Sequence, residues 1–353
     1  MKKIFFTPGP SQLYPTVPHH MRNALKENIG SISHRSKQFQ NIYTETVLLL
    51  RKLMNIPKTH QVFFLSSSLE AMERILQNTV EKYSFHFING EFSKKWYQFA
   101  LDLHKEPKKH EVEPGNGFDF SHVQIPQHIE LICITQNETS TGVYIPIEEI
   151  YELKKKHPSV LIALDIVSSV PYPQIDFSKI DMAFFSVQKG FGLPAGLSIL
   201  IVNENVLEKS SGTYHSFQSL MKMAEKNQTP ETPNVLYIYL LGKVCQDMLK
   251  KDIMKIRKET DTKAKILYDF AHKNKFKPFV KDKKFRSPTT IVLEVIGKKS
   301  YEIVSQLEKQ GLIVGKGYGQ FKEKHIRIAN FPAHTVGDIN RLKSMLHRYT
   351  SFL

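Results

Sequence analysis

The chain has 353 residues, a length typical of about two domains, and 41% of them are hydrophobic, which is enough to build substantial cores. No apolar run approaches the roughly 20 residues that a membrane-spanning helix needs, which argues against a membrane protein. The formal net charge is +15, from 49 Lys and Arg against 34 Asp and Glu. These basic residues are scattered in pairs and triplets, and no basic run alternates with aromatic residues, so we expect solvated helix faces and no nucleic-acid site. Such a surface still attracts anionic substrates and cofactors.

Cysteine usage and the start of the chain favour the cytoplasm. Cys133 lies in an apolar run and Cys245 in a segment with helical spacing, so we expect two buried thiols and no disulfide. No cluster of Cys and His has the spacing of a metal site, and we expect no metal. The charged start of the chain reaches the Pro-Gly-Pro sequence at residues 8–10 too early for the apolar region of a signal peptide.

Short apolar runs alternate with segments of helical spacing through the first two thirds of the chain. The runs are residues 62–65, 85–88, 131–135, 160–164, 182–185 and 198–202. Their alternation with helices predicts an α/β fold with a mostly parallel sheet that is covered by helices on both faces. We assign this larger domain to residues 14–240.

The pattern changes at about residue 240 and predicts a smaller domain. The expected elements are one long charged helix with a bend over residues 235–273, a strand at 290–295, a helix at 301–309, strands at 312–314 and 325–329, and a terminal helix. This order is typical of an α+β domain, which we assign to residues 241–353. We expect the turn-rich segment 1–13 to cross over and join it.

Three serines at a strand-to-helix turn have two interpretations. Residues 66–70, Ser-Ser-Ser-Leu-Glu, follow an apolar run and begin a helix. Ser67 with Glu70 three residues later matches a capping box, which by itself explains the serines. A helix N-terminus also offers free backbone N–H groups and the positive end of the helix dipole, which suit a phosphate.

An acid and a lysine follow two of the apolar runs. Asp165 closes the run at 160–164, and Lys189 lies in the Gly-rich stretch 186–196, where glycines permit tight turns and close approach to a ligand. A turn cap and a lysine that extends to solvent would explain each residue taken alone. Open α/β sheets bind ligands at the carboxyl ends of their strands. Pyridoxal phosphate needs a lysine to hold its aldehyde and a carboxylate to keep its ring nitrogen protonated, so the pair predicts this cofactor.

Several spaced motifs give the chain a family resemblance. Asp165, the Gln188-Lys189 pair and the glycines after it resemble the class V aminotransferases, which are pyridoxal-phosphate enzymes of fold type I. The similarity extends from the Phe-Thr-Pro-Gly-Pro sequence at 6–10 to the His-Ile-Arg-Ile sequence at 325–328. The motifs Ser-His-Arg-Ser at 33–36 with Phe39, Leu-Arg at 50–51 and Asn-Ile-Pro at 55–57 are most similar to the phosphoserine aminotransferases. The resemblance implies a homodimer with shared active sites.

The resemblance also implies the roles of individual residues toward the cofactor. Lys189 would hold pyridoxal 5'-phosphate and move the proton, and Asp165 would stabilise the protonated ring. Ser67 and Ser68 would contact the phosphate. The remaining cofactor contacts would come from Gln188, from Thr139 near the phenolic oxygen, from Phe92 stacked on the ring (with Trp96 as the alternative), and from Thr232 reaching the other subunit's site.

Substrate recognition is implied by a further set of residues. Arg327 would bind the substrate α-carboxylate, and His34 with Arg35 would meet a side-chain phosphate. Two positions depart from the phosphoserine aminotransferase pattern, because Leu69 stands where many of these enzymes have Arg and Glu231 where they often have Asn.

The expected activity is amino transfer from glutamate to 3-phosphohydroxypyruvate, a step of serine biosynthesis. An alanine– or serine–glyoxylate aminotransferase of the same family fits the His-Arg pair and the N-terminal motif as well. A basic binding protein built on an inactive transferase scaffold is the alternative from a different functional class.

Overall fold

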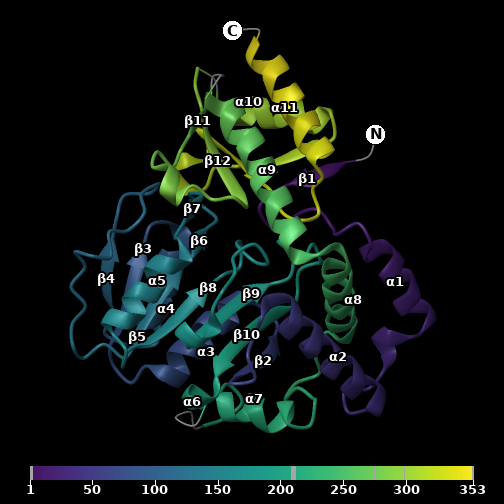
Figure 1. The fold of residues 1–353 in the computed structure, drawn as a ribbon, viewed down its shortest axis with the longest axis vertical. Helices are drawn as coiled ribbons and strands as arrows, with labels where there is room; N and C mark the ends of the chain where they lie inside the picture. Colours follow the sequence, from purple (N-terminus) through teal and green to yellow (C-terminus); the bar gives the residue numbers. More distant parts are fainter. Residues whose placement is uncertain (1–2, 208–211, 273–275, 298, 352–353) are drawn as a thin grey trace.

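A computed structural model describes residues 3–207, 212–272, 276–297 and 299–351 (Figure 1). The described chain forms two bodies, each built on its own sheet. A seven-stranded sheet with its helices forms the larger, lower body of Figure 1, and a five-stranded sheet with three helices forms the upper one. The predicted α/β architecture is confirmed.

The large sheet has the strand order β2-β10-β9-β8-β5-β3-β4. The pairs from β9 to β4 are parallel, whereas β10 is antiparallel to both β9 and β2. The strands are β2 His60–Leu65, β3 Ser84–Ile88, β4 Lys108–Glu111, β5 Leu131–Thr135, β8 Leu161–Asp165, β9 Met182–Ser186 and β10 Ser198–Asn203. Every residue of β3, β5 and β9 is buried, which is why these strands appear in the sequence as continuous apolar runs. The carboxyl ends of β2, β9, β8, β5 and β3 lie along one edge.

Helices surround this sheet, and a small hairpin follows β5. The helices are α1 Val17–Lys26, α2 Lys37–Met54, α3 Ser68–Thr79, α4 Glu91–Asp102, α5 Ile147–Lys156, α6 Glu204–Leu207, α7 Phe217–Ala224 and α8 Val235–Lys251; the hairpin strands are β6 Asn137–Glu138 and β7 Val143–Tyr144. Helices α3 and α4 pack against the sheet, while α1, α2 and α8 pack together at the right of Figure 1.

The small sheet has the order β1-β13-β14-β12-β11, and only the β1–β13 pair is parallel. Its strands are β1 Ile4–Phe6, β11 Phe276–Pro278, β12 Thr290–Val295, β13 Leu312–Lys316 and β14 His325–Ala329; its helices are α9 Ile253–His272, α10 Ser300–Lys309 and α11 Val336–Ser351. Because β1 belongs to this sheet, the start of the chain contributes a strand to the smaller body. Short 3-10 helices lie in the connections of both bodies: η1 Ile29–Ser31, η2 Phe177–Lys179, η3 Lys283–Phe285 and η4 Gly319–Phe321.

The long helix expected over residues 235–273 is two helices. Its last residue, 273, lies outside the described residues. The break falls at Asp252, whose positive φ of 76° ends α8 and whose side chain accepts a hydrogen bond from the backbone of Met254 in α9. Buried residues of α8 up to Met248 belong to the hydrophobic cluster of the larger body, whereas Leu267 and Phe270 of α9 belong to a second cluster in the smaller one. None of the described helices is long and apolar enough to cross a membrane.

Candidate active site

Lys189 and Asp165 lie at the carboxyl ends of neighbouring parallel strands. Strand β8 ends at Asp165, and β9 ends three residues before Lys189. Both side chains are buried, with 4% of Asp165 and 7% of Lys189 exposed. The edge of the sheet where the sequence predicts a ligand therefore brings the two residues into one buried region.

Burial disfavours the charged form of both side chains. Burial lowers the pKa of Lys189 and raises that of Asp165, and their mutual attraction offsets part of each shift. The lysine Nζ donates a hydrogen bond to Oγ1 of Thr139 at 2.8 Å, and Oδ1 of Asp165 accepts one from the backbone of Val167 at 2.9 Å. A lysine with a lowered pKa supplies the neutral amine that nucleophilic chemistry requires.

Thr139 is held in place by a carboxylate that the sequence analysis did not identify. Glu138 is fully buried, and its Oε1 accepts hydrogen bonds from the backbone and the hydroxyl of Ser140 at 3.0 and 2.7 Å. Its Oε2 accepts from the backbone N–H groups of Phe92 and Ser93 at 3.1 and 3.0 Å, at the N-terminus of α4. One side chain thus joins the loop that carries Thr139 to the helix that carries Phe92. An acid three residues after the mostly apolar run at 131–135 was the available signal.

Of the two aromatic candidates, Phe92 is the one that faces the lysine. Its ring centroid lies 5.3 Å from Nζ of Lys189. Trp96 is 1% exposed and donates its indole N–H to the carbonyl of Met72, so it belongs to the core.

The serine turn begins α3 next to the strand that leads to Lys189. Ser67 caps the helix and accepts a hydrogen bond from the backbone of Glu70 at 3.2 Å, but the Glu70 carboxylate bonds Ser66 instead of closing the capping box on Ser67. The hydroxyl of Ser68 lies 2.5 Å from that of Ser186 and 3.1 Å from that of Ser198. Three hydroxyl groups and a helix N-terminus therefore meet here. Ser186 and Ser198 were missed because their approach to Ser68 depends on strand pairing.

Arg327 of β14 brings the smaller body to the site. Its guanidinium donates to the carbonyl of Lys316 at 2.7 Å and to that of Thr139 at 3.3 Å. It also lies 5.2 Å from the ring centroid of Tyr318, whose ring is 5.8 Å from that of Phe92. Two of its five N–H donors are used by these bonds, and the rest are available to an anion.

Arg35 and the loop that carries Thr232 form a second group of residues. Arg35 is exposed and donates to the side chain of Gln228 at 2.8 Å, and to the carbonyls of Thr229 and Pro230 at 2.8 and 3.2 Å. It thereby fastens the loop on which Thr232 stands exposed.

The residues beside Arg35 and Thr232 complete this second group. His34 is partly buried, and desolvation together with Arg35 lowers its pKa. Glu231 accepts a hydrogen bond from the hydroxyl of Tyr214 at 3.3 Å, and burial raises its pKa. Within one chain, the structure brings none of these residues into hydrogen-bond contact with the described residues around Lys189.

The family model of the aminotransferase class-V proteins matches residues 4–321 of this chain. The chain belongs to the class V aminotransferases. The enzyme class and fold type I that the sequence analysis expected are confirmed by this match and by the solved relatives.

Solved and curated relatives of this class V aminotransferase include several named phosphoserine aminotransferases. The crystal structure of the one from Cytophaga hutchinsonii is 48% identical, covers 98% of each chain and superposes with a TM-score of 0.95. The phosphoserine aminotransferase of Bacillus thuringiensis subsp. konkukian is 26% identical over 95% of this chain and 96% of its own length. The alanine–glyoxylate aminotransferase of Nostoc sp., at 19% identity with 99% and 95% of the two chains covered and a TM-score of 0.86, shares the fold.

The residues of the site fit pyridoxal phosphate, the cofactor of this family. The α3 N-terminus with its three hydroxyls offers donors to a phosphate, and Phe92 offers a face to a ring. Asp165 is a buried carboxylate that forms no ion pair among the described residues, so a protonated ring nitrogen would supply the missing positive charge. The side-chain oxygen of Gln188 is buried without a partner in the described structure, which leaves it free for a ligand.

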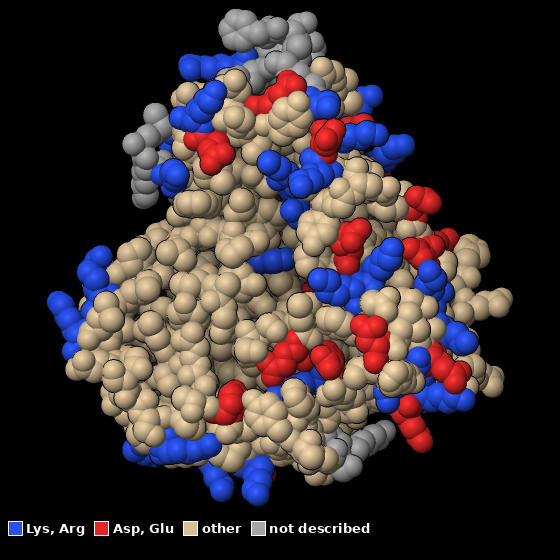
Figure 2. All heavy atoms as spheres, turned by 180° about the vertical axis from the view of Figure 1, so that it is seen from behind, with Lys and Arg blue, Asp and Glu red and all other residues tan. Residues whose placement is uncertain are grey.

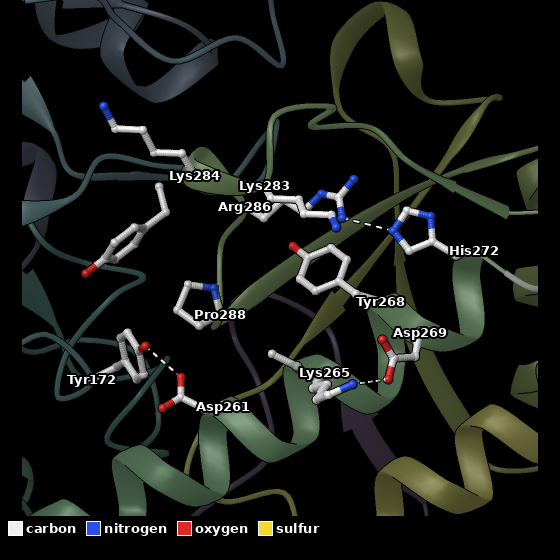
Figure 3. A pocket seen from close by; sticks show the side chains of 12 residues that line it. Tyr172, Asp261, Lys265, Tyr268, Asp269, His272, Lys283, Lys284, Arg286 and Pro288 are labelled. Carbon is white, nitrogen blue, oxygen red and sulfur yellow. Dashed lines mark hydrogen bonds and ion pairs between the residues drawn. The ribbon is translucent and has the colours of Figure 1, made fainter.

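A separate cavity of about 500 Å³ lies between the two bodies (Figure 3). Its charged groups are largely paired among themselves: Asp261 accepts from Tyr172 at 2.7 Å, and Lys265 binds Asp269 at 2.5 Å. The guanidinium of Arg286 bonds the imidazole of His272 at 3.0 Å. Since no residue predicted for the active site lines this cavity, it is distinct from the candidate site.

Proposed function

We propose that this class V aminotransferase is a phosphoserine aminotransferase, which transfers an amino group between glutamate and 3-phosphohydroxypyruvate. The observation that carries the proposal is the 48% identity over 98% of both chains to the phosphoserine aminotransferase of Cytophaga hutchinsonii. The relative named as an alanine–glyoxylate aminotransferase is 19% identical, a level that supports the common fold alone.

The buried lysine supplies the acid–base chemistry of the reaction. When bound, pyridoxal phosphate provides an electron sink that stabilises negative charge at the substrate Cα. Lys189 would hold the cofactor, and its free amine would act as base and acid that moves the proton between the substrate Cα and the cofactor. Thr139 orients that amine through its 2.8 Å hydrogen bond, and Asp165 would supply the negative charge that keeps the ring nitrogen protonated.

Two arginines divide substrate recognition in this proposal. Arg327 has free donors beside Thr139 and would bind the α-carboxylate that every amino acid and keto acid carries. Arg35 retains two of its five donors after its three bonds to the 228–230 loop, and with His34 it would meet the phosphate of the acceptor. Leu69 stands where many relatives have an arginine. His34 and Arg35 would therefore balance the negative charge of the phosphate without it.

We also propose a homodimer in which Arg35 and Thr232 serve the partner's site. Both residues are exposed, Arg35 binds the loop that carries Thr232, and no hydrogen bond joins either of them to the described residues around Lys189. Helices α1 and α2 nearby expose Leu25 to 71% and Leu48 to 60% in the single chain. A dimer interface on this side would bury these apolar side chains. Seen from behind, the left of the larger body, which is the side of α1 and α2 in Figure 1, has few charged side chains (Figure 2).

The partners and location follow from the same activity. Small amino acids and keto acids are the proposed ligands, and neither nucleic acid nor membrane is expected to bind. In Figure 2, acidic side chains are interspersed among many of the Lys and Arg side chains. Two free, buried cysteines support a cytoplasmic location.

The test compares two acceptors with glutamate as donor. Wild-type protein is expected to convert 3-phosphohydroxypyruvate with a far higher kcat/KM than glyoxylate or pyruvate. Arg35→Ala is expected to lose about 1.5–3 kcal/mol of transition-state binding for the phosphorylated acceptor, the worth of a hydrogen bond to a charged group, and much less for glyoxylate or pyruvate. Arg327→Ala should weaken all acceptors, and Arg348→Ala, an exposed arginine of α11, serves as the control. Equal losses for all acceptors on removing Arg35, with glyoxylate preferred by the wild type, would favour the glyoxylate-type enzyme.

A further inference from the structure

We propose that Gly9 is a positioning residue for the catalytic lysine. The N-terminal strap, residues 4–14, lies against the side chain of Lys189. A glycine at position 9 leaves room for that side chain. This inference rests on the proposed function, in which the amine of Lys189 moves the proton at the substrate.

The contact between strap and lysine leaves no room for a side chain on Gly9. A Cβ at this position would lie 2.8 Å from Cε of Lys189, 3.2 Å from Cγ and 3.5 Å from Cδ. Because carbon atoms in favourable contact are about 3.5–4.0 Å apart, two of these three distances are too short. The φ of Gly9, +139°, also belongs to a region that favours glycine. The strap backbone therefore covers the lysine stem up to the carbon that bears the amine.

The strap is fastened on both sides of Gly9. Before it, β1 pairs in parallel with β13 of the small sheet. After it, the backbone of Ser11 donates to the carbonyl of Gln188 at 3.1 Å, and that of Tyr14 donates to the carbonyl of Gly192 at 2.8 Å. Moving the strap aside would break these bonds on either side of the lysine. A side chain at position 9 is therefore expected to displace the lysine stem.

A displaced stem moves the amine away from its partners. Nζ of Lys189 is held 2.8 Å from Oγ1 of Thr139 and 5.3 Å from the ring centroid of Phe92. Proton transfer requires donor and acceptor within about 2.6–3.2 Å, and a misplacement of about 1 Å reduces a rate by about 10²-fold. The bonds that Arg327 makes to Lys316 and Thr139 do not involve the strap, so substrate carboxylate binding is expected to persist.

The first experiment separates kcat from KM. In Gly9→Ala, kcat is expected to fall by about 10²-fold while KM for glutamate changes by less than about threefold. Gly297→Ala is the matched control, because Gly297 also has a positive φ, of +77°, but no atom within 4 Å of the added Cβ. A wild-type kcat in Gly9→Ala, or an equal fall in both variants, would overturn the proposal.

The second experiment measures the contact by thermal unfolding and needs no turnover. Gly9→Ala is made in three backgrounds: wild type, Lys189→Met, which keeps the stem and removes the amine, and Lys189→Ala, which removes the stem. The Tm loss caused by Gly9→Ala is expected to be similar in the first two and much smaller in the third, because contacting residues are coupled.

The outcomes of the two experiments are distinguishable from failure of the proposed function. The same Tm loss in all three backgrounds would overturn the proposal, even if Gly9→Ala folds poorly on its own. Absence of amino transfer by the wild type would reject the proposed function and leave the unfolding result interpretable.

Discussion

At the scale of single residues, the site combines two buried groups of opposite charge that form no ion pair with each other. The amine of Lys189 is bonded to a neutral hydroxyl, and Asp165 receives a backbone N–H. Each therefore stays available for a ligand. Both were predicted from sequence because each follows an apolar run and parallel strands end at one edge.

Replacing Asp165 by Asn tests whether its charge matters. Asp165→Asn keeps the shape of the side chain and its bond to Val167, yet removes the negative charge. We expect cofactor binding to persist and kcat to fall by about 10²-fold or more, because a preorganised charge at the reacting group is lost. Asp176→Asn, an exposed acid that caps a 3-10 helix, is the control. Near-normal turnover in Asp165→Asn would show that Asp165 serves only to cap a turn.

Other residues of the site could not be predicted one at a time. Glu138 acts through bonds to Phe92 and Ser140, and Ser186 through its contact with Ser68. The Glu138–Phe92 and Ser186–Ser68 contacts join residues 46 and 118 positions apart, a separation that local sequence patterns do not encode.

At the scale of elements, the strap is tied to the small body by a buried histidine. Nε2 of His334 bonds the carbonyl of Phe5 at 2.9 Å, and Nδ1 accepts from the backbone of Phe331 at 3.1 Å. The ring also stacks on Phe6, with centroids 4.8 Å apart. Since Nδ1 is an acceptor, the imidazole is neutral, and burial lowers its pKa to about 4.

This histidine makes the free energy of unfolding depend on pH. The folded-state pKa lies below the ordinary value of 6.5, so the unfolded chain binds more protons between these values. His334 therefore contributes stability that is present above pH 6.5 and lost as pH falls toward 4. Between pH 7 and pH 5 the loss is up to about 2 kcal/mol.

His334→Gln isolates this contribution from that of other buried histidines. Glutamine does not titrate, so the variant is expected to lose less stability than the wild type between pH 7 and pH 5 in urea unfolding. An equal loss in both proteins would contradict the assigned protonation state.

The elements themselves were largely predictable, with informative exceptions. The six buried strands of the large sheet were found because burial on both faces makes them apolar. Strand β4, Lys-Lys-His-Glu, was missed because an edge strand with exposed side chains has no such pattern. The predicted domain boundary at residue 240 falls inside α8, whose break at Asp252 depends on one backbone conformation.

At the scale of the whole molecule, the proposed shared site makes a prediction about mixed dimers. Lys189→Ala and Thr232→Ala chains, mixed and allowed to exchange, would form dimers in which one site carries both lesions and the other neither. With equal amounts, half of the dimers are mixed, so activity should rise to about a quarter of the wild-type value. Mass spectrometry under native conditions verifies exchange. Activity no higher than the mean of the two parents after verified exchange would place Thr232 in its own chain's site.

The central claim is that Lys189 is the residue that holds the cofactor. The purified protein is treated with borohydride, digested, and examined by mass spectrometry for a peptide that carries a reduced pyridoxyl group. We expect the group on Lys189 alone, and its absence from Lys189→Ala, because this lysine joins a buried position at a strand end to a lowered pKa. A pyridoxyl group on any other lysine of the wild-type protein, or on none, would contradict the account.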